Sequence, residues 1–244
     1  MLRSDGRSSD QMRPIRFVPE FTKNADGSCL VEYGETKVIC TATVEDGVPN
    51  WLRNASPPQG WLTAEYSMLP GATSTRSRRE RNHTSGRTQE IQRLIGRSLR
   101  GIIDLNLCPD ISITCDCDVI QADGGTRTAS ITGAFVALKL AVDKAIRAKR
   151  IKNNPIKDAV AAVSVGLKDS EILVDLNYIE DSSADLDMNV VLTQSGKILE
   201  IQGTAERAAF SKEEVMRIIE ASEQAVTPLF DLQHAAADGQ IVES

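Results

Sequence analysis

The strongest candidate for chemistry is a glycine-rich run, Gly124-Gly125-Thr126-Arg127-Thr128, which lies between a predicted strand and a predicted helix. Two glycines let the backbone approach a ligand closely, and the free N–H groups of a helix start favour an anion. Arg127 adds positive charge and parallel donors that suit a phosphate, while Thr126 or Thr128 can cap the helix. The run lacks the Lys-Ser/Thr ending of a P-loop. A tight turn closed by an N-cap is the simpler alternative.

A second candidate is the run 180–187, in which Glu180, Asp181, Asp185 and Asp187 place four acids within eight residues. Asp185 and Asp187 have the spacing of one face of a strand, and Asp187 opens an otherwise apolar strand. Such carboxylates can bind a hard divalent cation, or one of them can be held in its protonated form. The alternative is a solvated acidic loop between two strands.

Arginine is concentrated in residues 76–100, which hold eight arginines, no lysine and two glutamates. Arginine forks recognise phosphate groups in a way that lysine does not, so the sequence predicts a loop that faces RNA. The arginines of this predicted loop are Arg76, Arg78, Arg79 and Arg81. A merely solvated basic loop is the alternative.

The charge of the 244-residue chain is distributed unevenly. The formal net charge is −6, yet residues 1–100 carry +4, residues 101–168 carry +2 and residues 169–244 carry −12. An asymmetry of this kind points to a surface that faces a polyanion, which the net charge alone would argue against.

Composition excludes several classes of protein. With 41% hydrophobic and 25% charged residues, the chain has the make-up of a globular protein and not of a disordered one. No run is long and apolar enough to cross a membrane, and residues 1–5 do not resemble a secretory signal, so we expect a cytoplasmic protein. Five cysteines, an odd number, argue against a disulfide framework. Cys115 and Cys117 lack partners at zinc spacing and are predicted to face the core. Two histidines offer no convincing Ser-His-Asp or Cys-His site.

The elements that must position these residues follow from periodicity. A hairpin is predicted over 28–45, a helix from about 86, a strand over 111–120 and a largely buried helix over 131–150. Residues 46–85, with Pro49, Pro57, Pro58 and Pro70, are predicted to form a long irregular excursion.

The second half has a similar outline. Hairpins are predicted over 159–178 and 188–203, and a helix opens at Ser211, which forms a capping-box pattern with Glu214. We therefore expect an α+β fold in which two similar halves, approximately 1–150 and 151–244, form a single compact domain spanning 1–244.

Six segments together resemble the bacterial ribonuclease PH family. They are Arg3-Ser4-Asp5-Gly6-Arg7, Gly34–Val38, Ser85–Arg93, Asp123–Thr128, Asp185–Val190 and Glu200–Glu206, and they occur in order over nearly the whole chain. Polynucleotide phosphorylase and exosome ring subunits are similar, but the former is far longer. The resemblance implies two similar β-α halves, of the type seen in domain 2 of ribosomal protein S5, and a homohexamer built as a trimer of dimers.

The resemblance also implies a reaction. Inorganic phosphate, as co-substrate, attacks the terminal phosphodiester of an RNA 3′ end and releases a nucleoside diphosphate, and the implied substrate is the 3′ trailer of precursor tRNA. The matching phosphate ligands are Arg87, Gly125, Thr126 and Arg127. The matching carboxylates are Asp181 and Asp187, which in similar enzymes lie near the scissile bond and a divalent cation, expected to be Mg²⁺.

The residues agree with this chemistry, because phosphoryl transfer depends on positioning and charge neutralisation more than on covalent catalysis. Asp187 can assist the departing 3′ oxygen either as a protonated acid or through a bound cation, and the sequence leaves both roles open. The competing hypothesis is an inactive ring subunit that only binds RNA. Retention of both the Gly-Gly-Thr-Arg turn and the Asp181/Asp187 pair favours an active enzyme.

Overall fold

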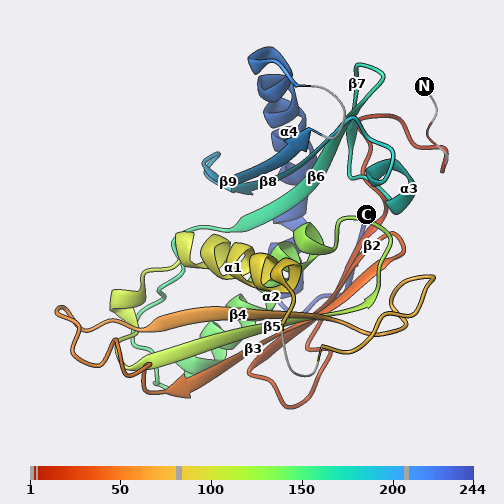
Figure 1. The fold of residues 1–244 in the computed structure, drawn as a ribbon. Helices are drawn as coiled ribbons and strands as arrows, with labels where there is room; N and C mark the ends of the chain where they lie inside the picture. Colours follow the sequence, from red (N-terminus) through yellow and green to blue (C-terminus); the bar gives the residue numbers. More distant parts are fainter. Residues whose placement is uncertain (1–2, 4, 81–83, 206–208) are drawn as a thin grey trace.

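A computed structural model describes residues 3, 5–80, 84–205 and 209–244 of the chain. The described residues form two β-sheets with α-helices packed between and beside them, which confirms the predicted α+β class (Figure 1).

The larger sheet has six strands in the order β10-β1-β2-β3-β5-β4. β4 and β5 are parallel, and the other neighbours are antiparallel. The strands are β1 (Ile15–Pro19), β2 (Gly27–Tyr33), β3 (Thr36–Asp46), β4 (Trp61–Met68), β5 (Ile111–Gln121) and β10 (Val242–Glu243). The predicted hairpin over 28–45 is confirmed as β2 and β3. In β5, Cys115 and Cys117 are buried as predicted, while Asp116 and Asp118 lie on the opposite face.

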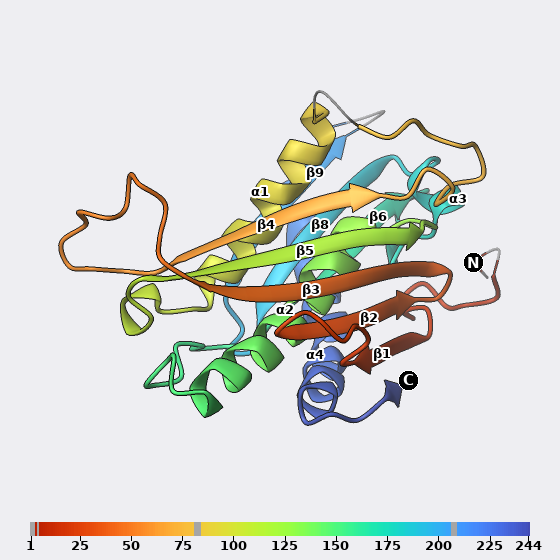
Figure 2. The same cartoon turned by 90° about the horizontal axis from the view of Figure 1, so that it is seen from below.

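The interpretation of residues 46–85 as wholly irregular is wrong, because β4 lies within them. Leu62, Ala64 and Tyr66 alternate with more exposed residues and pack into the core. The alternation is short, and the prolines at 57, 58 and 70 on either side of it made it hard to recognise. An alternation of this length is nevertheless enough to predict a strand of eight residues. β4 ends at Met68, and the segment with Arg76, Arg78 and Arg79 follows from that end of the larger sheet (Figure 2).

Two helices of the first half lie between the sheets (Figure 1). α1 (Gly86–Gly101) buries an apolar face that includes Ile91, Leu94 and Leu99. α2 (Thr126–Arg147) is buried along most of its length and packs against β2 and β3 on one side and β6 on the other. A short 3-10 helix, η1 (Leu105–Leu107), connects α1 to β5.

The smaller sheet has the order β7-β6-β8-β9, with all neighbours antiparallel. Its strands are β6 (Val160–Lys168), β7 (Glu171–Val174), β8 (Leu186–Thr193) and β9 (Ile198–Ala205). The predicted hairpins are therefore confirmed except at one end. Residues 175–178 leave the sheet instead of extending it, because Asn177 caps a short helix, α3 (Tyr178–Asp181), through a capping box with Glu180.

The C-terminal helix, α4 (Lys212–Ala237), begins at the predicted capping box of Ser211 and Glu214 and packs against β6 and α2. After α4 the chain returns to the larger sheet, where β10 pairs with β1. One hydrophobic cluster runs from Ile15 to Ala236 and includes residues of both sheets. None of the helices in the described ranges is long and apolar enough to cross a membrane.

Candidate active site

All six residues predicted to bind phosphate or act in catalysis line one cavity of about 300 Å³. They come from four places in the fold: the start of α1, the turn between β5 and α2, the end of α3, and the start of β8. These residues are Arg87, Gly125, Thr126, Arg127, Asp181 and Asp187. The structure thus brings a predicted anion site and a predicted carboxylate pair into a single space.

The glycine turn, Gly124 and Gly125, lines this cavity. Gly124 and Gly125 have φ values of +76° and +65°, a left-handed conformation that glycine adopts without the penalty of a side chain. Gly125 is the N-cap residue of α2 and supplies no side-chain hydrogen bond to the helix. The first helical turn, with the positive end of the helix dipole, therefore lies at the cavity and has no capping side chain.

The predicted capping by Thr126 or Thr128 is wrong. The Thr126 hydroxyl lies 3.0 Å from the Tyr66 hydroxyl, and the Thr128 hydroxyl donates to the Gly125 carbonyl at 2.9 Å. Both threonines thus fix the turn through other partners. Since neither hydroxyl caps the N–H groups at the helix start, a bound anion can satisfy them.

Two arginines supply the positive charge. Arg87 is exposed at the start of α1, while Arg127 is half-buried and forms an ion pair with Glu90 at 3.1 Å. Glu90 also accepts a hydrogen bond from Gln202 at 2.9 Å, so its carboxylate is held in place. The buried Nε of Arg127 has no hydrogen-bond partner in the part of the chain that the structure describes, so this arginine retains donor capacity for a ligand.

The two carboxylates line the same cavity as the two arginines. Burial raises the pKa of Asp181 above its ordinary value, although the charges of Arg127 and Arg87 act in the opposite direction. Asp187 stands near the start of β8, where it pairs with Gly166 of β6 and Thr204 of β9. Asp185 is not among the lining residues; its carboxylate accepts a hydrogen bond from the Asp169 N–H at 3.3 Å.

The two carboxylates are also the residues predicted to hold a divalent cation. Across the described ranges no group of three or more Asp, Glu, His or Cys side chains could hold a metal ion by itself. Mg²⁺ is commonly held by one or two carboxylates together with substrate phosphates and water. Asp181 and Asp187 fit that kind of site, in which the substrate completes the ligand set.

Glu180 has a structural place instead of a catalytic one. Its carboxylate pairs with Arg3 and lies 3.6 Å from Arg7, both of which belong to the N-terminal segment. Burial alone would raise the pKa of Glu180, but the hydrogen bonds from Arg3 and the Asn177 N–H, and the two arginine charges, lower it. Of the four acids predicted as a group, Glu180 therefore attaches α3 to the N-terminal segment.

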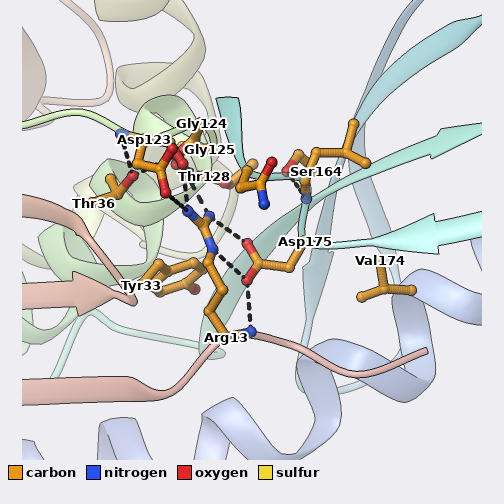
Figure 3. Close-up of polar contacts among 12 residues, drawn as sticks. Arg13, Tyr33, Thr36, Asp123, Gly124, Gly125, Thr128, Ser164, Val174 and Asp175 are labelled. Carbon is orange, nitrogen blue, oxygen red and sulfur yellow. Dashed lines mark hydrogen bonds and ion pairs between the residues drawn. The ribbon is translucent and has the colours of Figure 1, made fainter. Parts of the chain in front are cut away.

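A buried ion pair that the sequence analysis missed lies directly beneath the glycine turn. Arg13 binds the carboxylate of Asp175 and also reaches the backbone of the turn (Figure 3). The sequence signal was weak, because Arg13 and Asp175 are separated by 162 positions and neither belongs to a charged run.

The predicted arginine loop lies next to the cavity. Arg76, Arg78 and Arg79 are exposed on a segment without helix or strand, and Arg81 lies outside the described residues. Arg78 and Arg79 line a second cavity of about 340 Å³, whereas Arg76 does not. Arg87 lines both cavities, so the two spaces adjoin.

The predicted burial of Cys115 and Cys117 is confirmed. All five cysteines are free and buried, so none forms a disulfide. Burial raises the pKa of Cys115 well above its ordinary value, which leaves a protonated thiol in the core.

Comparisons with known proteins agree with this architecture. Domain 1 of the 3′ exoribonuclease family matches residues 11–142, and domain 2 of the same family matches residues 158–225. Together the two matched segments contain all six residues that line the cavity and were predicted as its ligands and carboxylates.

Solved structures share the fold at low sequence identity. A chain of the Archaeoglobus fulgidus exosome with RNA bound to its active site is 21% identical, with a TM-score of 0.80 over 94% of this chain and 91% of that one. Rice (Oryza sativa) Rrp46 is 18% identical, with a TM-score of 0.78 over 96% of this chain and 100% of that one. A chain of an archaeal exosome core is 19% identical, with a TM-score of 0.76 over 97% of this chain and 91% of that one.

Proposed function

Because the chain belongs to the 3′ exoribonuclease family, we propose that it is a phosphorolytic 3′-to-5′ exoribonuclease of the ribonuclease PH type. Inorganic phosphate is the nucleophile and nucleoside diphosphates are the product. The observation that carries the proposal is the single cavity in which an anion-binding turn, two arginines and two carboxylates meet. A binding protein for RNA alone has no need of this combination.

The phosphate nucleophile is assigned to the Gly125–Arg127 side of the cavity. Backbone N–H groups at the start of α2 orient its oxygens, and the guanidinium groups of Arg87 and Arg127 neutralise its charge. These two arginines reduce the repulsion between this phosphate and the phosphodiester that it attacks.

In the reaction, an oxygen of inorganic phosphate bonds to the phosphorus of the terminal phosphodiester. The bond from that phosphorus to the 3′ oxygen of the penultimate nucleotide breaks, and this oxygen receives a proton. The products are a nucleoside diphosphate and an RNA that is one nucleotide shorter. Asp181 and Asp187 line the same cavity and are the groups assigned to the leaving oxygen.

Burial favours the protonated form of Asp181, which suits a group that donates a proton. When bound, a Mg²⁺ ion would supply charge neutralisation at the leaving oxygen, and Asp181 and Asp187 would hold it. Whether Asp187 acts as an acid or as a metal ligand is distinguished by the Asp187→Asn and Asp187→Ala variants. An acid is needed at every cation concentration, whereas the effect of a lost metal ligand is relieved by excess Mg²⁺.

While the RNA 3′ end reacts in the first cavity, the body of the tRNA is the proposed partner of the arginine loop at the second cavity. Arg78 and Arg79 line this cavity, and Arg76 lies exposed beside it, so the segment can follow a phosphate backbone without reading its sequence. Precursor tRNA with a 3′ trailer is the proposed substrate, and a cytoplasmic homohexamer, as a trimer of dimers, is the proposed assembly. Both rest on the resemblance to ribonuclease PH, and the fold shared with exosome core chains is compatible with a ring.

The test is incubation of the purified protein with a tailed tRNA, with and without inorganic phosphate, followed by identification of the mononucleotide released. Diphosphates that form only with phosphate support the proposal, and monophosphates indicate a hydrolase. A protein that binds the RNA but releases neither product is the inactive ring subunit of the competing hypothesis.

A further inference from the structure

The buried pair Arg13–Asp175 joins the N-terminal segment to the strand end that precedes α3. The side chain of Arg13 is 4% exposed and that of Asp175 is fully buried. The Arg13 guanidinium donates to the Asp175 carboxylate from Nε at 2.9 Å and from Nη2 at 2.7 Å, and the Arg13 backbone N–H donates to it at 2.9 Å. One carboxylate is thus held by three donors of one residue (Figure 3).

The same guanidinium supports the glycine turn from behind. Its Nη1 donates to the Asp123 carbonyl, and its Nη2 lies 3.5 Å from the Gly124 carbonyl. A Cβ at Gly125 would stand 3.1 Å from that Nη2, so the guanidinium packs directly against the turn. The Thr36 hydroxyl also holds the turn: it donates to the Gly124 carbonyl at 2.6 Å and accepts from the Asp123 N–H at 2.9 Å.

The glycine turn also contacts the backbone that leads into α3. A Cβ on Gly124 would stand 2.4 Å from the Leu176 carbonyl oxygen, which leaves room for glycine alone. The Tyr178 N–H, at the first residue of α3, donates to the Asp123 carboxylate at 3.2 Å. The anion-binding turn and the helix that carries Asp181 are therefore in direct contact above Arg13.

We infer that Arg13 is a positioning residue, whose guanidinium, fixed by Asp175, sets the glycine turn and α3 in the relative arrangement that makes one cavity of them. Arg13 does not line that cavity and acts only through the turn. The inference rests on the proposed function in one respect, the identification of the anion as inorganic phosphate.

Arg13→Lys tests this inference without removing the buried charge. Lysine keeps an ammonium opposite Asp175, and Arg7, 3.5 Å from the same carboxylate, gives a second cation. A single ammonium cannot reproduce the planar fork that binds Asp175 and the two turn carbonyls together. Arg13→Ala is unsuitable, because a buried carboxylate that loses its main partner threatens folding itself.

The expected result is a Kd for inorganic phosphate, measured by calorimetry, that rises about tenfold in Arg13→Lys. The phosphate KM should rise in parallel, while the RNA KM changes by less than about twofold. Arg16→Lys is the matched control, since Arg16 lies three residues away and pairs with Glu32 at 3.2 Å on the surface. It should leave all three constants unchanged.

Thr36→Val removes a second contact of the same turn, the hydroxyl bonded to the Gly124 carbonyl, with almost no change in shape. It should also weaken phosphate binding, and Thr36→Ser, which restores the hydroxyl, should return the Kd to the wild-type value. A general loss of stability lowers the melting temperature and the active fraction but does not change a dissociation constant, so the Kd separates positioning from folding.

Two outcomes overturn the inference. One is an unchanged phosphate Kd in Arg13→Lys and Thr36→Val, whatever their melting temperatures. The other is a wild-type protein that binds no phosphate. A wild-type protein that binds phosphate and releases no diphosphates refutes the proposed function instead, and the Kd values of the variants still decide the role of Arg13.

Discussion

Removal of the Arg127 side chain is the most direct test of the phosphate site. In the Arg127→Ala variant, the cavity loses one of its two guanidinium groups, while the glycine turn, Arg87 and both carboxylates remain. Folding should be preserved, because the ion pair with Glu90 is partly exposed, with side chains 20% and 35% accessible. Ion pairs of this kind contribute about 0 to 1 kcal/mol to stability.

The magnitude follows from the donors that Arg127 offers. Its Nη2 is engaged by Glu90, whereas the buried Nε has no partner among the described residues, so donors remain for an anion. A hydrogen bond to a charged group is worth about 1.5 to 3 kcal/mol. Two such bonds, which are not fully additive, correspond to about 3 kcal/mol, or a phosphate KM raised on the order of a hundredfold.

The assay measures release of nucleoside diphosphates from a tailed tRNA as phosphate is varied, together with thermal melting and the assembly state of each variant. Arg93→Ala is the matched control, since Arg93 is an exposed arginine of α1 that does not line the cavity. Arg127→Lys should be intermediate, because it keeps the charge and loses the fork. A folded Arg127→Ala protein with a phosphate KM within twofold of wild type would refute the assignment of Arg127.

Three further predictions concern other parts of the site. Replacement of Arg76, Arg78, Arg79 and Arg81 by alanine should weaken tRNA binding and flatten its salt dependence by about 0.7 to 0.9 in log–log slope per lost phosphate contact. Phosphate affinity should stay unchanged, and an unaltered slope in a KCl titration would show that the loop is only solvated. Tyr178, 62% exposed at the cavity, should stack on a terminal base. Tyr178→Ala is then expected to raise the RNA KM about tenfold and Tyr178→Phe to leave it unchanged, as stacking is worth about 1 to 3 kcal/mol per base; equal KM values for the two variants would exclude this contact. Because the pKa of Asp181 is raised in the folded protein, its ionisation opposes folding as pH rises through that pKa, and the effect is absent below the unfolded value of 3.8. Asp181→Asn should therefore raise the melting temperature relative to wild type at pH 7 and not at pH 3.5, and an equal difference at both would contradict burial as the cause.

Much of the fold could be predicted from patterns of residues that are close in sequence. The alternation in β5 and the capping box of α4 each depend on residues that are close in sequence, and both are confirmed. β4 was missed because flanking prolines interrupt its surroundings. The short helix α3 was missed because a strong apolar run before it suggested a longer strand, although Asn177 and Glu180 have the spacing of a capping box.

The candidate site, too, could be predicted only in part from the sequence. The glycine turn and the acidic run could be identified as chemistry from residue type alone, and the structure places Arg87, Asp181 and Asp187 with the turn in one cavity. Residue type could not separate the four acids, because tertiary contacts decide their roles. Glu180 faces Arg3, Asp185 receives a backbone N–H, and only the two others reach the cavity.

The uneven distribution of charge has a second explanation that the sequence alone could not supply. Part of the positive charge of residues 1–100 never faces a ligand, because Arg3, Arg7 and Arg13 are buried against Asp175 and Glu180 of the acidic final part. The N-terminal arginines and the acidic residues around α3 are thus complementary in charge. The arginines that remain for a polyanion are those beside the cavities, among them Arg78, Arg79 and Arg87. The same asymmetry therefore reflects both assembly of the site from distant segments and the surface offered to RNA. Two of the substitutions described above should separate these contributions: Arg13→Lys is expected to weaken phosphate binding, whereas alanine at Arg78 and Arg79 is expected to reduce the salt dependence of RNA binding.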